Sequence, residues 1–509
     1  MMQPARIIGN ALDSLVGIIS PRRGIVRKQT RAAIYAAAQS PRTTGDWVPF
    51  DSSINLIVHA SSLRVRARVR QLVRDFPYFH RAVKVLTDFS VGSGIVYQSA
   101  IRTKDGILDK EKIKLAEDAW NLWCEEADAT GRLHLYEMMN LAKRQDLETG
   151  EFLLVKTNIN KKSRYMPLAL QMYESDWLTD TGSNPLIGND VHQGIEYDPV
   201  TGRIIAYNFT DPDGWGKSIR IDASRVIHGF QTLRPGQMRG ISDFAPGVLL
   251  AHDLDTYMSA EMDGAKMAAK WLAMVETPDP LSRQIGLQSD DAGHKIDSLE
   301  NAIIEYLRPG EKMTLSSNPR PGSNFPPMVK LILTMLSVTT GVPYELLSGN
   351  YEGMNFSTAK MVRNDFSQHL KPVISRHVRG FCEPVKRAFF ESAVLSGRLP
   401  FRDYFTNPAS YLRANWQPPG MESPDIARET KSMIDQIMAG LRSPQEIAQS
   451  RGRDMEEIYR EIKESQDLAE SMGIKLNMGA ISTAIANNPA AIDQQGAVPA
   501  NDQGAQANA

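Results

Sequence analysis

Apolar residues recur three and four positions apart over much of the chain, which is the spacing of amphipathic α-helices. Residues 62–92 follow this pattern and predict two helices with a break near Pro77, because proline lacks the amide donor that a helix interior needs. Lys110–Glu126 predicts another helix, with Trp120 and Trp123 on the same face. The first part of the chain therefore contains several helices that bury one face each.

A different pattern follows, in which short β-branched or aromatic runs alternate with turn-forming residues. Turns such as Asp198-Pro199 and Thr201-Gly202 separate these runs. The predicted strands are Glu151–Asn158, Leu168–Met172, Ile195–Tyr197, Ile204–Thr210 and Val226–Phe230. Together with the preceding helices they predict an α+β domain over residues 50–240.

Beyond this domain the pattern is again helical. Pro246–Val275 predicts a helix about 45 Å long, and Pro327–Thr340 predicts a second one. Ser357–Ser396 predicts a very long helix that bends near Pro372 and Pro384. The first of these helices carries small residues, which let a neighbouring helix approach closely: Ala260, Ala265, Ala268, Ala269 and Ala273.

The remaining segments differ in composition. Residues 277–327 are rich in proline and are predicted to be mostly loop, whereas residues 425–473 predict two or three further helices. Residues 1–42 contain seven Arg or Lys and one Asp, so this basic arm either is simply solvated or contacts a partner or nucleic acid. From about Asn477 the chain is rich in Ala, Asn, Gln and Gly and is predicted to be disordered.

Charge and cysteine content narrow the functional classes. The 58 Lys and Arg nearly balance the 59 Asp and Glu, whereas nucleic-acid binders usually show a basic excess, so any DNA contact is expected to be local or weak. No apolar run approaches the ~20 residues that a bilayer requires. Cys124 and Cys382 lie far apart in helical patterns and predict buried free thiols in a reducing compartment.

The sequence contains no common catalytic motif. Gly-x-x-x-x-Gly-Lys-Ser/Thr, His-Glu-x-x-His and Gly-x-Ser-x-Gly are all absent. A two-metal nuclease site would have to use carboxylates at turn and strand ends, namely Glu174, Asp176, Asp190, Glu196 and Asp198. Solvated carboxylates are common at such positions. We therefore expect a protein that is not an enzyme and has no catalytic, metal or cofactor site.

Several stretches, taken in order, resemble the portal proteins of the lambda-type family of tailed phages. The resemblance extends from about Ser62 to Lys463. It is carried by Arg74–Gly94, by Trp120 and Trp123 with Ala127-Asp128 and Gly131, by Gly194–Tyr197 with Gly202-Arg203 and Ala206-Tyr207, by Arg234-Pro235-Gly236-Gln237 with Arg239-Gly240, by Gly341–Gly349 with Asn355-Phe356-Ser357, and by Gly440-Leu441 with Ser443 and Arg451-Gly452. Each motif alone is weak, and their order along the chain is what is specific.

The resemblance implies an α+β portal fold with an α/β wing, a two-helix stem, a clip, a tunnel loop with a long helix, and a helical crown. The implied segments are a basic arm (1–42), the wing (43–245), a first stem helix (246–275), the clip (276–324), a second stem helix (325–347), the tunnel loop (348–356), the long helix of the wing (357–400), the crown (401–476) and a disordered tail (477–509).

The implied function is a ring at one capsid vertex, through which DNA is packaged and later ejected. The ring would be a dodecamer that is assembled in the host cytoplasm and ends in the virion. The implied partners are double-stranded DNA, the terminase large subunit, the major capsid protein, and head-completion, adaptor and tail proteins, with no membrane. The residues leave two alternatives open, a metal-dependent nuclease associated with packaging and another capsid component.

Candidate site residues follow from the same assignment. The tunnel loop comprises Gly349, Asn350, Tyr351, Glu352, Gly353, Met354 and Asn355, and Asn355 or Ser357 would cap the next helix. Further DNA contacts are expected at Lys360, Arg363, Lys266 and Lys270. Asp253, Asp255, Glu261 and Asp263 would line the channel and repel phosphates, or else form salt bridges between subunits or face solvent. Pro278, Arg283, Arg308 and Arg320 would bind partners at the clip.

Overall fold

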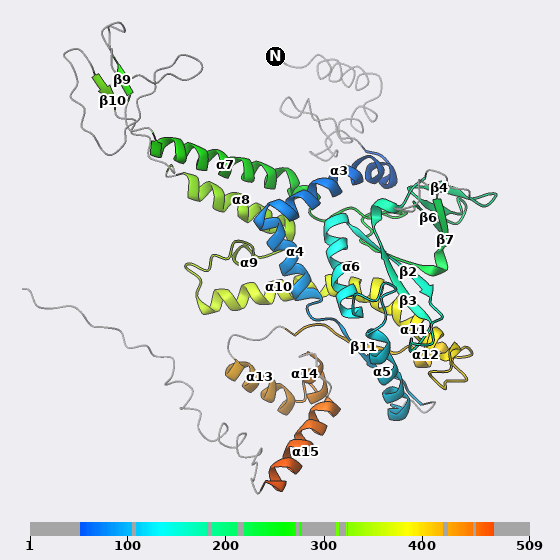
Figure 1. The fold of residues 1–509 in the computed structure, drawn as a ribbon. Helices are drawn as coiled ribbons and strands as arrows, with labels where there is room; N and C mark the ends of the chain where they lie inside the picture. Colours follow the sequence, from blue (N-terminus) through cyan, green and yellow to red (C-terminus); the bar gives the residue numbers. More distant parts are fainter. Residues whose placement is uncertain are drawn as a thin grey trace, which may run out of the picture. The chain divides into compact units, whose positions relative to one another are not determined.

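The computed structural model describes residues 51–103, 108–180, 185–210, 218–270, 274–276, 312–314, 322, 324–420, 426–450 and 455–472 (Figure 1). The chain divides into two units, Met1–Ile57 and Val58–Ala509, and all elements below except the start of the first helix belong to the second unit. The predicted basic arm and the predicted disordered tail lie outside the described residues.

Four helices open the described chain: α3 (Ile54–Asp75), α4 (Pro77–Ser90), α5 (Lys110–Cys124) and α6 (Leu135–Thr149). Pro77 occupies the first turn of α4, where its missing amide costs no hydrogen bond, and this confirms the predicted break. Helix α6 ends at Gly150, whose φ of 89° is a left-handed conformation that favours glycine.

Antiparallel sheets follow. One sheet has the order β3-β2-β8, from β2 (Glu151–Asn158), β3 (Leu168–Tyr173) and β8 (Val226–Phe230). A second has the order β4-β5-β6-β7, from β4 (Asp190–His192), β5 (Ile195–Tyr197), β6 (Ile204–Thr210) and β7 (Ser218–Asp222). Short 3₁₀ turns lie at η3 (Ser175–Trp177), η4 (Ala223–Arg225) and η5 (Ala245–Gly247). All five predicted strands are confirmed.

Two further strand pairs join distant parts of the chain. Strand β1 (Val96–Ser99) pairs with β11 (Ala414–Gln417), and β9 (Met274–Glu276) pairs with β10 (Lys312–Thr314). The sequence did not predict these pairs.

The largest core cluster centres on aromatic side chains. The rings of Trp120 and Trp123 lie 5.0 and 5.4 Å from that of Phe389, centroid to centroid, and all three side chains are buried. This packing joins α5 to a helix more than 200 residues away. Cys124 and Cys382 are buried free thiols in the same cluster, as predicted.

Helices α7 (Val248–Lys270) and α8 (Phe325–Thr340) lie side by side (Figure 1). The prediction that the first of these continues to Val275 is wrong, because Val275 belongs to strand β9, which pairs with β10. Helix α8 ends at Thr340, as predicted. The following Gly341 has a φ of 71°, and the chain then forms the short helix α9 (Tyr344–Ser348).

The predicted long helix is present as α10 (Phe356–His377), the π-helix η6 (Val378–Cys382) and α11 (Glu383–Leu395). Its irregular turn is η6, which lies between the two prolines and not at either of them. After α12 (Pro408–Tyr411), the helices α13 (Ile426–Met438), α14 (Pro444–Ser450) and α15 (Met455–Ser471) confirm the helices predicted for residues 425–473.

Candidate functional site

Helices α7 and α8 pack against each other and against the core through one face each. Leu254 on α7 and Leu333 and Leu336 on α8 are buried there. The rings of Tyr257 and Phe325 lie 5.4 Å apart between centroids and extend the contact along the pair. These contacts determine which face of each helix is turned outward.

The outward face of α8 is apolar. Its large side chains recur at intervals of three and four residues, and they are Met328, Leu331, Met335 and Val338, exposed by 46, 56, 50 and 80 %. Lys330 is the only charged residue in the whole helix. Contiguous apolar faces of this kind usually mark a protein–protein contact.

The outward side of α7 is mixed: it carries polar and small side chains together with the exposed apolar Leu249 and Met262. Its exposed small residues are Thr256, Ser259 and Ala260. Of the predicted channel-lining acids, Asp253, Asp255 and Asp263 are exposed and Glu261 is half-buried. Lys266 donates a hydrogen bond of 3.0 Å to Asp263, so part of its charge is balanced within α7. The side chain of Lys270 lies outside the described residues.

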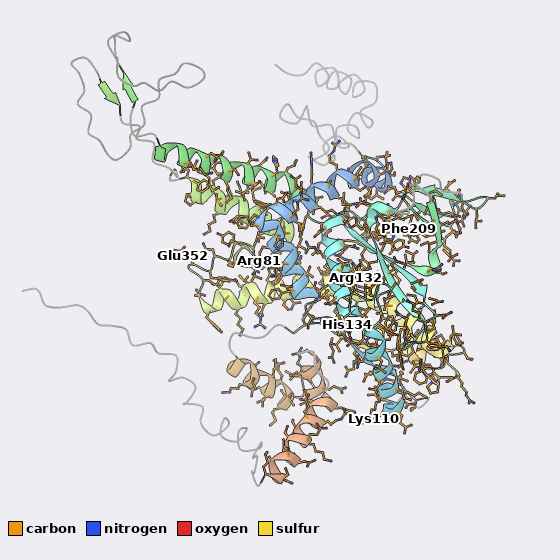
Figure 2. All side chains as sticks on the ribbon, in the orientation of Figure 1. Arg81, Lys110, Arg132, His134, Phe209 and Glu352 are labelled. Atoms are coloured by element: carbon orange, nitrogen blue, oxygen red, sulfur yellow. The ribbon has the colours of Figure 1, made fainter. Side chains whose placement is uncertain are left out.

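The predicted tunnel loop connects α9 to α10 and is exposed except at Met354, which is half-buried (Figure 2). Gly349 ends α9 with a φ of 70°. The amide of Glu352 donates to the Asn350 side chain at 2.9 Å. The Asn355 side chain accepts from the amide of Thr358 at 2.8 Å, which confirms the predicted cap and gives α10 a defined first turn.

The other predicted contact residues are distributed around this loop or fall outside the description. Lys360 is exposed in the second turn of α10, and Arg363 is half-buried one turn later. The predicted clip residues, which are Pro278, Arg283, Arg308 and Arg320, lie outside the described residues.

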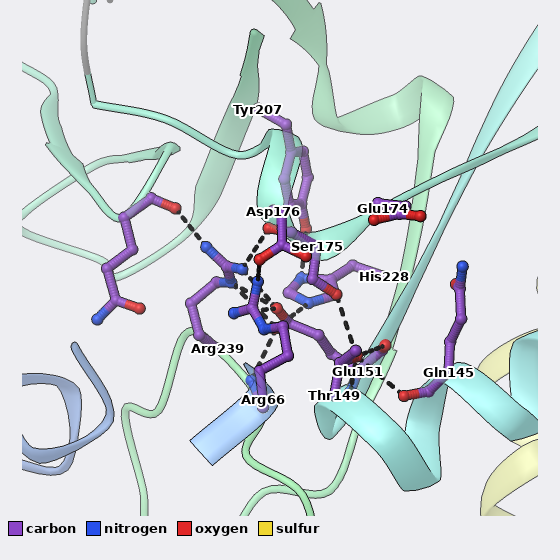
Figure 3. A network of polar contacts seen from close by, with 12 residues as sticks. Arg66, Gln145, Thr149, Glu151, Glu174, Ser175, Asp176, Tyr207, His228 and Arg239 are labelled. Atoms are coloured by element: carbon purple, nitrogen blue, oxygen red, sulfur yellow. Dashed lines mark hydrogen bonds and ion pairs between the residues drawn. The ribbon is translucent and has the colours of Figure 1, made fainter. Parts of the chain in front are cut away.

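The segment that leads into α7 is held by a buried polar network around Arg239 (Figure 3), and Gln237, the buried residue of the Arg-Pro-Gly-Gln motif, contacts this segment. The Gln237 side chain accepts from the amide of Leu233 at 2.7 Å and donates to the carbonyl of Arg239 at 2.8 Å. Arg239 in turn donates through Nε to both carboxylate oxygens of Glu151, at 2.9 and 3.0 Å. The motif therefore connects the loop to strand β2.

Glu151 is fully buried and has further partners. Its Oε2 accepts from the amide of Gly240 at 2.8 Å and lies 3.1 Å from Nε2 of His228. Burial by itself would raise the pKa of the Glu151 carboxyl, but Arg239 and His228 outweigh burial and hold this pKa well below its usual range. Glu151 is therefore the anion around which this part of the molecule is organised.

A second buried guanidinium joins the network from α3. Arg66 lies 4.0 Å from Glu151 and forms an ion pair with Asp176, which also pairs with Arg70 (Figure 3). Burial lowers the pKa of Arg66, while the two carboxylates act in the opposite direction. The network thus connects α3, the β2 sheet and the segment before α7.

Sequence reasoning found the Arg239 motif but not its partners. Arg66 was not singled out because it is one of several alternating arginines in α3, and Glu151 was not because it is a lone carboxylate at the start of an apolar strand. The signal in the sequence is the glycine at positions 150 and 240; in the structure, a Cβ added at Gly240 would lie 2.0 Å from the carbonyl oxygen of Gly150. Two glycines that border the same buried carboxylate indicate close backbone packing.

Several of the carboxylates considered for a nuclease site are engaged by arginines. Asp176 pairs with Arg66 and Arg70, and Glu196 pairs with Arg220, whose hydrogen bond lowers the pKa of Glu196 to about 2. Within the described ranges, no three His, Cys, Asp or Glu side chains are grouped in a way that would hold a metal ion. Among those same residues, no helix is long and apolar enough to cross a membrane.

Comparisons with known proteins give a consistent result. A family model described as "Phage portal protein, lambda family" matches residues 40–372. The "Probable portal protein" of Halomonas phage phiHAP-1 is 26% identical over 481 residues, which cover 89% of this chain and 90% of the relative. The "Portal protein" of Escherichia phage N15 is 23% identical, and the match covers 84% of this chain and 87% of the relative. The "Portal protein B" of Escherichia phage lambda is 21% identical, and the match covers 84% of this chain and 86% of the relative.

Solved structures to which this chain is similar come from gene transfer agent particles. A chain of the virion of the native particle is 14% identical with a TM-score of 0.45, and the match covers 78% of this chain and 98% of that one. A chain of the neck of the native particle, computed with C12 symmetry, is also 14% identical, with a TM-score of 0.43. This match covers 76% of this chain and 97% of that one.

Proposed function

The chain belongs to the lambda family of phage portal proteins, and on this basis we propose that twelve copies close into a ring through their α7–α8 pairs. The observation that carries this proposal is the apolar outward face of α8, with Leu331, Met335 and Val338 exposed. On α7, the exposed Leu249, Thr256 and Ala260 are spaced seven and four residues apart, and they would form the opposite side of the contact. A contact between two different faces is heterologous, and heterologous contacts generate rings when the rotation closes.

The ring would surround a channel for double-stranded DNA. The exposed loop Gly349–Asn355 would reach the DNA, because it has two glycines, short polar side chains and no packing that holds its tip. Exposed carboxylates on α7, such as Asp253 and Asp255, would repel phosphates and keep the wall from binding DNA tightly. Lys266 and Lys360 would supply weak local contacts.

The same family assignment supplies the partners that we propose for the assembled ring. The terminase large subunit and later the head-completion, adaptor and tail proteins would bind the clip (276–324), and the major capsid protein would bind around the ring. Assembly would take place in the host cytoplasm, and the ring would have no catalytic role.

Ring formation can be tested with one substitution and a matched control. Leu331→Glu places a charge on the outward face of α8, and we expect it to convert the ring into monomers or small oligomers in size-exclusion chromatography with light scattering. Leu122→Glu on α5 is the control, because Leu122 is exposed to the same degree, 57% against 56% for Leu331. A Leu331→Glu chain that still forms rings would contradict the proposed contact.

A further inference from the structure

A row of polar side chains follows the exposed face of α10 well beyond the tunnel loop. Its members recur at intervals of three and four residues and are all exposed: Lys360, Asn364, Gln368, Lys371, Ser375 and Arg379. At 1.5 Å per residue the row is about 28 Å long. We call these six residues the α10 track.

The positive charges of the track are not balanced by carboxylates. Lys371 donates to the amide oxygen of Gln368 at 3.1 Å, and Arg379 donates to the hydroxyl of Ser375 at 3.1 Å. Both acceptors are neutral, so these contacts orient the cations without neutralising them. Asp365, the only acidic residue in α10, is not a member of the row.

Several cations elsewhere in the protein are paired with carboxylates. Arg220 pairs with the buried Glu196, and Arg66 and Arg70 share Asp176. On the α10 track, by contrast, no carboxylate of the described residues lies within ion-pair distance of a cation. The side chains between the cations are amides and a hydroxyl. The track thus combines Lys and Arg with Asn, Gln and Ser. In protein–DNA complexes, side chains of these types contact phosphate and sugar.

We propose that the α10 track binds the phosphate backbone of duplex DNA, as a contact surface separate from the tunnel loop. This inference rests on the proposed function, which brings DNA to the protein. A row of about 28 Å matches about eight base-pair steps of 3.4 Å. Three cations per chain give a weak contact that DNA can leave again, because the salt-dependent affinity grows with every phosphate neutralised.

The test compares two double variants of the full chain. Lys371→Gln with Arg379→Gln removes two cations from the track but leaves the tunnel loop intact. Arg64→Gln with Arg68→Gln removes two exposed cations, four residues apart, from α3 and changes the net charge equally. Binding of a short fluorescent DNA duplex is measured by anisotropy over a series of KCl concentrations.

We expect the track variant to bind at least about tenfold more weakly at low salt. Its slope of log affinity against log salt should fall by about 2, because each neutralised phosphate contributes about 0.9 to that slope. The α3 variant should retain the wild-type slope. Equal losses in both variants, or an unchanged slope in the track variant, would overturn the proposal.

Two further measurements keep the result interpretable. Asn364→Asp adds a negative charge to the track without removing a cation, and it should also weaken DNA binding; unchanged binding would count against the track. Polyglutamate should displace DNA only poorly, and efficient displacement would indicate an acidic protein as the occupant. Light scattering on the same samples reports ring assembly, so a failure of the ring is distinguished from a failure of the track.

Discussion

Glu151 receives hydrogen bonds from residues that are far apart in sequence, although its own side chain is inaccessible to water. Arg239 and Gly240 bind it from the segment before α7, and His228 approaches from strand β8. Removing one partner of a buried ion pair leaves the other charge uncompensated, which is costlier than the loss of a surface pair. The stability of the whole network therefore depends on this one carboxylate.

We predict that Glu151→Gln lowers the free energy of unfolding by about 3–5 kcal/mol, because Arg239 stays buried without a counter-ion. Urea denaturation of the full chain measures this loss. Glu148→Gln is the control, since Glu148 pairs with the half-exposed Arg144, and its loss should stay below about 0.5 kcal/mol. Similar losses in the two variants would contradict the role given to Glu151.

His377 is a second buried titratable residue. Its ring stacks on Phe381 with 5.5 Å between centroids, and Lys143, Asp146 and Arg376 are the charged residues around it. Burial, and then Lys143, lower the pKa of His377 to about 3. Below about pH 6.5 the unfolded chain takes up a proton that the folded chain does not, so stability falls as the pH falls from that value.

The expected result is that the wild-type chain loses stability between pH 7 and pH 5 and that His377→Gln loses less over the same interval. Urea midpoints at the two pH values measure the difference. His252→Gln, which changes an exposed histidine on α7, should lose as much as the wild type. If His377→Gln were as pH-sensitive as the wild type, the burial argument would be wrong.

At the scale of elements, helices were more predictable than strand pairs. The spacing of apolar residues predicted the positions of α5, α8 and the α10–α11 helix closely. Each of these helices buries one face, and the apolar residues of that face are evident in the sequence. Strand β1 was missed because its partner β11 lies over 300 residues away, as in the pair Val96 and Gln417. A four-residue strand has no recognisable pattern without its partner.

The candidate site was predictable only in part. Glycines and short polar residues indicated the loop Gly349–Asn355, and the sequence left Asn355 or Ser357 as the cap, of which the structure shows Asn355. The apolar residues of α8 were visible in the sequence, but their pattern does not tell which of them α7 covers. The outward position of Leu331 and Val338 is decided by tertiary packing.

The backbone at Gly240 packs closely against the backbone at Gly150, and this contact gives a prediction at the scale of elements. Gly240→Ala should destabilise the protein by about 1–3 kcal/mol, because the added Cβ would lie 2.0 Å from the Gly150 carbonyl oxygen. Gly380→Ala is the control: its Cβ would meet Phe152 at an ordinary 3.8 Å. Thermal unfolding measures both, and a Gly240→Ala protein as stable as the wild type would contradict the tight contact.

At the scale of the whole molecule, one surface and the overall charge bear on the proposed ring. The outward face of α8 would be covered by a neighbouring subunit, and the near balance of 58 cations against 59 anions would keep the proposed channel from binding DNA tightly. Family membership identifies the chain as a phage portal protein. These two properties would suit the channel that we propose. The proposed ring contact through α7 and α8 would link these two properties.

An electron-microscopic reconstruction of the purified full-length chain tests this contact most directly. The account predicts a closed ring with a central opening, in which Leu331, Met335 and Val338 of one subunit lie against α7 of the next. A compact monomer, or a ring in which the outward face of α8 remains exposed to solvent, would contradict it.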